Sequence, residues 1–176
     1  MTMIEQERAI GNYTEKTDKS SNEISHVERL HLVLLIEQLN AVKKYKPETG
    51  YLAVSLVDRY LVQWVKGKAG LSCLITLGLT CLLVAAKIEQ SLQPSFNRMI
   101  KLLQQKHDIS RPKQDLINME EQIIRVLDYE LRSVGSVTFL ERYFRIFGID
   151  QNNKDANAGV IMELANDYCS FTQRDS

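Results

Sequence analysis

The residues that most often carry chemistry are few in this sequence and are poorly spaced for it. Histidine occurs three times, as His26, His31 and His107. His26 and His31 are five residues apart on one predicted helix, so they face different ways. This spacing does not suit a metal site or a catalytic triad, and no glycine-rich phosphate-binding motif accompanies it. The sequence therefore predicts a protein that is not an enzyme and that needs no metal and no cofactor.

The cysteines also give no sign of a reactive or bridged site. Cys73, Cys81 and Cys169 form no C-x-x-C pair, and the first two lie in an apolar run. An odd count in this setting predicts buried thiols in a reducing compartment. The polar N-terminal segment has no secretory signal, and the longest apolar stretch, residues 71–86, is too short to span a bilayer. We expect a nuclear or cytoplasmic protein that does not insert into a membrane.

Charge argues against nucleic acid as a partner. The 176 residues include 22 Lys and Arg and 22 Asp and Glu, so the formal net charge is zero. Affinity for a phosphate backbone comes mainly from an excess of basic side chains. A neutral chain is therefore a poor candidate for nonspecific binding to nucleic acid, and a composition that is 44% hydrophobic is ordinary for a soluble globular protein.

The hydrophobic pattern is helical throughout, and strand-like alternation is absent. Apolar residues recur at helical spacing in the segments 26–45, 48–65, 72–89, 94–106, 110–127 and 137–147. The segment 72–89 is apolar on almost every side, which is typical of a helix surrounded by others. We therefore predict an all-α fold in which five helices form one domain around a central apolar helix.

The same pattern divides the chain into three parts. Residues 1–22 are polar and are predicted to be a flexible arm. Residues 23–148 form the helical domain. Residues 149–176 are predicted to contain a polar linker, from Asn152 to Asn157, and a terminal helix whose apolar side chains run from Val160 to Tyr168.

Four phrases stand in order along the helical domain. They are LAVSLVDRYL at 52–61, LLVAAKIE at 82–89, NMEEQIIRVL at 118–127 and TFLERYF at 138–144. Together they resemble the N-terminal cyclin box of the cyclin family, over roughly residues 25 to 147. The resemblance implies that the terminal helix is the first helix of an incomplete second box. It also implies that Arg29 and Asp58 form a buried ion pair that fixes the first helix against the second.

The resemblance further implies a heterodimer with a cyclin-dependent protein kinase. Lys87 and Glu120 match the residues that contact the kinase near its mobile regulatory helix. Around them, the residues expected at the same face are Val84, Ile88, Glu89, Ile124, Tyr129 and Leu131. A cyclin box on this pattern activates the kinase by stabilising the active position of that helix. The alternative is a one-box adaptor or structural subunit of a larger assembly, with no kinase activation.

Overall fold

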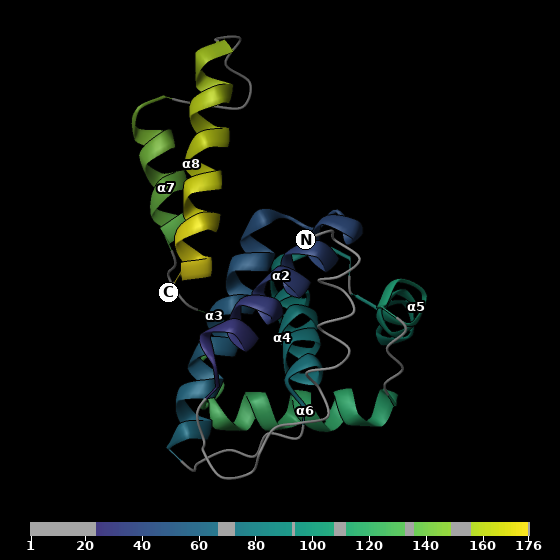
Figure 1. Ribbon diagram of the computed structural model, residues 1–176. Coiled ribbons are helices and arrows are strands. Elements are labelled where there is room, and N and C mark those ends of the chain that lie inside the picture. Colours follow the sequence, from purple (N-terminus) through teal and green to yellow (C-terminus); the bar gives the residue numbers. More distant parts are fainter. Residues whose placement is uncertain are drawn as a thin grey trace.

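The computed structural model describes residues 24–66, 73–92, 94–107, 112–132, 136–148 and 156–175. Within these ranges every regular element is an α-helix and no strand occurs, which confirms the predicted all-α class. Helices α2 to α6 form a box of crossing helices, and α7 and α8 stand out from it as a hairpin (Figure 1). The predicted arm at residues 1–22 lies outside the described residues.

Helix α2 (His26–Lys43) begins where the sequence signals it. Ser25 accepts from the backbone N–H of Val27, and the Glu28 carboxylate accepts from the N–H of Ser25 at 2.9 Å. This reciprocal capping satisfies N–H groups that the first turn leaves without partners. Lys44 ends the helix in the left-handed conformation, with φ 53°.

Helix α3 (Pro47–Val65) follows after three residues. Pro47 occupies its first turn, where the missing N–H of a proline costs no helical hydrogen bond.

Helix α4 (Leu74–Glu89) is the centre of the box, as its all-round apolar sequence predicts. Every residue from Ile75 to Ala86 is buried, and the helix packs against α2, α3 and α6 (Lys113–Val126). Gly78 permits the close crossing with α2, because a Cβ at this position would lie 2.4 Å from Cδ1 of Leu32. The carboxyl end of α4 is tied to the start of α3 by Gln90, whose amide donates to the Thr49 hydroxyl at 2.7 Å.

Helix α5 (Phe96–His107) packs against α6 at the side of the box (Figure 1). Pro112 caps α6, which buries Leu116, Met119 and Ile123 against the core. These three side chains recur at spacings of three and four, so they lie on one side of the helix. The opposite side of α6 faces solvent.

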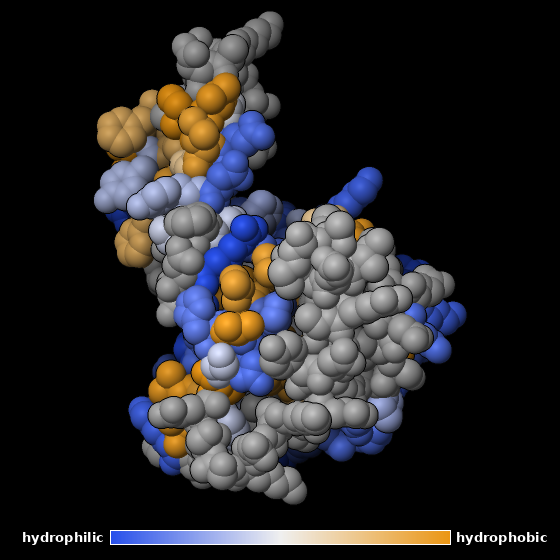
Figure 2. Space-filling model, viewed as in Figure 1, coloured by the Kyte–Doolittle hydropathy of each residue, from blue (hydrophilic) through white to orange (hydrophobic). Residues whose placement is uncertain are grey.

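Helices α7 (Ser136–Ile146) and α8 (Ala156–Asp175) pack against each other. The terminal helix is longer than its apolar stripe predicts, and it begins at Ala156, inside the segment expected to be a linker. The boundary predicted at residue 148 therefore falls between the two helices of one hairpin. Apolar side chains gather on the face of this hairpin that Figure 2 presents.

The carboxyl-terminal half of α8 is docked on the box by polar contacts. The Tyr51 hydroxyl on α3 donates to the Asn166 carbonyl at 3.0 Å and lies 2.9 Å from the Ser170 hydroxyl. Arg174 pairs with Glu37 of α2 at 2.7 Å, and this hydrogen bond raises the pKa of the arginine. Burial raises the pKa of Tyr51, which keeps its phenol protonated and able to donate.

Candidate functional site

Lys87 and Glu120 meet across two helices. The lysine lies in the last turn of α4, and the glutamate lies midway along α6, on the side that faces α4. The Lys87 ammonium is 2.5 Å from Oε1 of Glu120, and the two side chains are 32% and 16% exposed. Both side chains of the pair are therefore largely covered, and part of each still reaches solvent. An ammonium at this end of α4 also interacts favourably with the carbonyls of the helix terminus.

Phe96 completes this contact, although the sequence does not predict it. Its ring centroid lies 4.8 Å from Nζ of Lys87, within the range of a cation–π interaction. Phe96 begins α5, which places it beside the end of α4 although nine positions separate the two residues in the chain. No local spacing rule predicts such a contact, because it depends on how α5 returns across the box.

The other predicted residues differ in how much of each reaches solvent. Val84 is only 3% exposed and belongs to the core, so it cannot line an open surface as the resemblance implied. Ile88 and Leu131 are partly buried and pack against the core cluster. Glu89 and Ile124 are half-buried.

Tyr129 is the most exposed of the predicted residues, at 75%. It follows α6 in a turn where both Asp128 and Tyr129 adopt positive φ, 51° and 64°. Its N–H donates to the carbonyl of Ile124 at 3.0 Å, which closes the end of α6. The left-handed conformation is uncommon for a large side chain and costs roughly 1 kcal/mol or more. The strained turn therefore holds the exposed ring of Tyr129 beside the end of α6.

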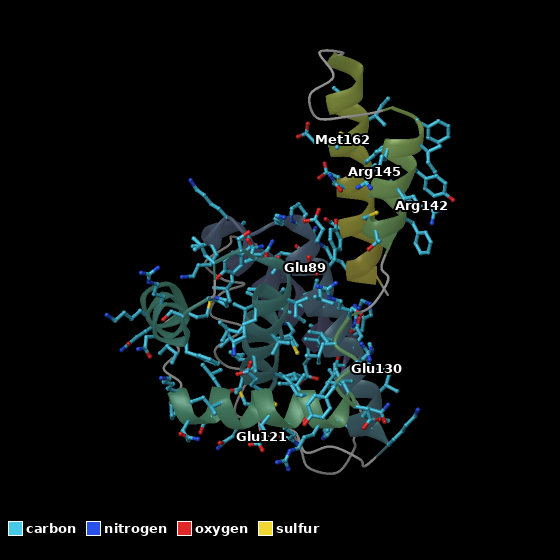
Figure 3. The ribbon with its side chains drawn as sticks, turned by 180° about the vertical axis from the view of Figure 1, so that it is seen from behind. Glu89, Glu121, Glu130, Arg142, Arg145 and Met162 are labelled. Atoms are coloured by element: carbon cyan, nitrogen blue, oxygen red, sulfur yellow. The ribbon has the colours of Figure 1, made fainter. Side chains whose placement is uncertain are left out.

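Glu121 lies next to Glu120 in the sequence, and its surroundings can be compared with those of Glu120. It lies on the outer side of α6, turned away from the box (Figure 3). It pairs with Arg125 one turn along the same helix, and both side chains are more than half exposed. Exposed pairs of this kind contribute little to stability. The adjacent glutamates therefore have different surroundings: Glu120 links two helices, whereas Glu121 contacts only its own.

Arg29 and Asp58 join α2 to α3 through two hydrogen bonds. Nε and Nη2 of Arg29 donate to the two carboxylate oxygens of Asp58, each at 2.9 Å. The arginine side chain is 14% exposed and the aspartate 39%, so the pair is only partly buried, in contrast to the buried pair expected. Arg29 also donates to the carbonyl of Arg174 at 3.5 Å, which connects the pair to α8.

Comparison with known proteins decides the family. The profile of "Cyclin, N-terminal domain" matches residues 1–132, which include helices α2 to α6. The chain belongs to the cyclin family. Its matched region ends before α7, so the hairpin lies beyond it.

Several cyclins resemble this one over most of its length. Cyclin-A1-2 of Arabidopsis thaliana is 30% identical over 136 residues, which cover 76% of this chain and 28% of that protein. Putative cyclin-A3-1 of the same plant is 30% identical over 79% of this chain and 36% of its own length. G1/S-specific cyclin-E of Drosophila melanogaster is 30% identical over 67% of this chain and 16% of its own. The chain thus spans about a third or less of these relatives.

The described part of this cyclin was also compared with the requirements of a metal site and of a membrane-spanning helix. The described ranges contain no group of three or more His, Cys, Asp and Glu side chains placed to hold a metal ion. Among the helices that the structure describes, none combines the length and the apolar character needed to cross a membrane.

Removing Asp58 should destabilise the cyclin box moderately. We expect Asp58→Ala to lower the free energy of unfolding by about 1–2 kcal/mol, between the values for exposed and for buried pairs. The loss arises because Arg29, at 14% exposed, would keep a largely desolvated guanidinium without its carboxylate. Urea denaturation followed by circular dichroism measures it. Arg125→Ala, which removes the exposed pair on α6, serves as the control and should change stability by less than about 0.5 kcal/mol.

Proposed function

We propose that this cyclin box is a regulatory subunit that binds a cyclin-dependent protein kinase and activates it by stabilising the active position of the kinase's regulatory helix. The observation that carries the proposal is the ion pair between Lys87 and Glu120, which holds two charged side chains together at an accessible junction of α4 and α6. Because the chain spans only part of its relatives, the activity is inferred from this geometry and from the family.

The chemistry of the pair suits recognition of another protein's helix. The Lys87 ammonium has three N–H groups and gives one of them to Glu120, so the others can donate to carbonyl groups at a helix end of the partner. Glu120 and the ring of Phe96 hold the lysine in one direction before binding. Holding a long side chain in its bound geometry reduces the entropy lost on association.

Apolar side chains that follow the pair along α4 and beyond the end of α6 can supply the centre of such an interface. Ile88 and Leu131 are partly exposed, and Tyr129 is largely exposed. Tyrosine is among the residues that most often contribute a large part of the binding free energy at the middle of an interface, and the surrounding side chains exclude water from it. A helix of the kinase lying against these side chains would bury them.

Activation then requires no chemistry from the cyclin itself. A kinase needs a Lys–Glu ion pair and a metal-binding Asp in register, and its regulatory helix sets that register. A partner shifts the population of the active state only by its difference in affinity for the two states. A change from 1:99 to 99:1 needs about 5.5 kcal/mol, which is within the reach of an interface of standard size.

Capture of cyclin-dependent kinases tests the proposal directly. We expect the purified chain to retain at least one kinase from a panel and to raise its activity. Lys87→Ala with Glu120→Ala should weaken capture about 30-fold, the effect of losing a typical binding hot spot. Glu121→Ala with Arg125→Ala removes a pair from the outer side of the same helix and should leave capture unchanged.

Two results would contradict different parts of the proposal. A wild-type chain that captures no kinase of the panel rejects the kinase-binding function and favours the one-box adaptor. A chain that captures a kinase equally well with and without Lys87 and Glu120 rejects the site and keeps the function. Unchanged helical circular dichroism of both double variants shows that the comparison concerns binding and not folding.

A further inference from the structure

Basic side chains gather around the turn that joins α2 to α3 and on the neighbouring helix α5. Three lysines lie within four positions of that turn, and two further cations lie three positions apart on α5. These residues, which together form the basic edge, are Lys43, Lys44, Lys46, Arg98 and Lys101. All are exposed except Lys43, which is half-buried. The segments 40–50 and 94–107 contain a single acidic residue, Glu48, so the edge is basic although the whole chain is neutral.

Hydrogen bonds hold the backbone of the turn between α2 and α3 in one conformation. Lys44 has a φ of 53°, and its N–H donates to the carbonyl of Ala41 at 3.0 Å. The N–H of Tyr45 donates to the carbonyl of Asn40 at 3.1 Å, and the side-chain amide of Asn40 donates to the carbonyl of Lys46 at 3.2 Å. Tyr45 is partly buried against the core, whereas the lysines on either side of it are exposed. The turn therefore presents two ammonium groups to solvent from a fixed backbone.

Cations of the basic edge stand where a positive charge is unfavourable. Lys46 directly precedes the first turn of α3, at the end of the helix dipole that favours carboxylates. Lys43 lies close enough to Arg98 for the two charges to repel, and its pKa is lowered, first by burial and then by the guanidinium. None of the five cations forms an ion pair with a carboxylate that the structure describes. Unfavourable local choices without local compensation are expected where a protein binds something else.

We propose that the basic edge binds an acidic segment of another protein. Carboxylates placed along the edge would accept from the ammonium and guanidinium groups and would offset the repulsion between Lys43 and Arg98. The cations are spread over a turn and a separate helix, so they suit several carboxylates along a chain. A single phosphate group is more often held by converging backbone N–H groups of a glycine-rich loop, which this sequence lacks. Nucleic acid is disfavoured because a net charge of zero gives little general attraction to a polyanion.

The basic edge is distinct from the ion pair proposed to contact a kinase. Phe96 and Arg98 are two positions apart on α5, so they lie on different sides of that helix. The ring of Phe96 contacts Lys87, whereas the charge of Arg98 acts on Lys43. An acidic segment can therefore occupy the edge while another partner occupies the junction of α4 and α6. The inference does not rest on the proposed function.

Fluorescence anisotropy with a labelled peptide tests the inference on the 176-residue chain. The peptide alternates glutamate with serine, and its control carries glutamine in place of every glutamate. We expect the acidic peptide alone to bind, and added salt to weaken its binding. Lys43→Gln with Arg98→Gln should weaken binding about tenfold. Lys66→Gln with Arg132→Gln removes two exposed positive charges that follow α3 and α6, and should leave binding unchanged.

The pKa of Lys43, followed by NMR of its side chain, gives a second readout. In Arg98→Gln this pKa should rise, because one of the two causes that lower it is gone. The acidic peptide should also raise it in the wild type, because a nearby carboxylate favours the charged ammonium. A pKa of Lys43 that neither change moves would overturn the proposal. Unchanged helical circular dichroism of each variant shows that the fold is retained.

The anisotropy experiment can reject either the site or its occupant. If the acidic peptide fails to bind the wild type, or binds the Lys43 and Arg98 variant as tightly, the basic edge is not the site. If a peptide with one phosphoserine and no glutamate binds as tightly, the occupant is a phosphate group. Equal affinity for a DNA duplex would instead show a general attraction to polyanions, and would also overturn the proposal. The assay contains no kinase, so none of these results bears on the proposed function.

Discussion

Exchanging Lys87 and Glu120 is expected to abolish kinase binding while leaving the cyclin box folded. Lys87→Glu with Glu120→Lys keeps one positive and one negative side chain at the junction of α4 and α6, so the internal ion pair can re-form with its direction reversed. The kinase, however, would meet a carboxylate in place of an ammonium. Like-charge contacts and unpaired donors at an interface cost several kcal/mol, so we expect the dissociation constant to rise about 100-fold or more. Surface plasmon resonance with the captured kinase measures the change.

The exchange separates two roles that alanine variants cannot. If the pair only fastened α4 to α6, the exchanged chain would bind as tightly as the wild type, and the assignment of this site would be wrong. Each single reversal is the matched comparison, because Lys87→Glu alone brings two carboxylates together and should lower thermal stability as well as binding. A similar melting temperature for the wild type and the exchanged chain is therefore part of the expected result.

Leu82→Ala should destabilise the cyclin box far more than the loss of the partly buried Arg29–Asp58 pair or of the exposed Glu121–Arg125 pair. Leu82 lies in the middle of α4 and has no exposed surface. Three helices pack against α4, so the cavity left by the missing atoms cannot collapse fully. Such truncations cost about 3–5 kcal/mol, against a total stability of about 5–15 kcal/mol for a domain of this kind. Urea denaturation should show a clearly lower midpoint with an unchanged slope.

Leu92→Ala is the matched control for the core variant. It removes the same atoms from a leucine that is 85% exposed, so the free energy of unfolding should change by less than about 0.5 kcal/mol. A loss below about 1 kcal/mol for Leu82→Ala would mean that α4 is not the closely packed centre of the box. The difference between the two leucines reports mainly on burial, because the substitution is the same although Leu92 lies in a bend after α4.

The sequence predicted best what depends on local pattern. The all-round apolar character of 72–89 located the central helix, because only a surrounded helix can bury every side. The predicted segment 26–45 starts where α2 does, at a boundary that is local because Ser25 and Glu28, which form the capping contact, are three residues apart. The resemblance to cyclins directed attention to Lys87 and Glu120, and the structure places their side chains in contact.

What the sequence did not predict depends on contacts between distant elements. The docking of the last turns of α8 was not predicted, because these turns contact Tyr51 and Glu37, more than a hundred positions earlier. Phe96 was missed because its contact with Lys87 depends on the path of α5. Val84 was misplaced because helical spacing gives the side of α4 on which a residue lies, but every side of α4 is covered in this fold.

Helix α8 makes its polar contacts with the box only through its carboxyl-terminal half, so a small rotation there would displace its other end. A helix of 20 residues is about 30 Å long, and only its carboxyl-terminal half is fastened to α2 and α3. A tilt of about 10° at the fastened end would move the other end by roughly 5 Å. Since Arg29 contacts both Asp58 and the carbonyl of Arg174, such a tilt would pull on the same guanidinium that joins α2 to α3. A partner bound at the outer part of the hairpin would therefore act on the contact between α2 and α3 through α8.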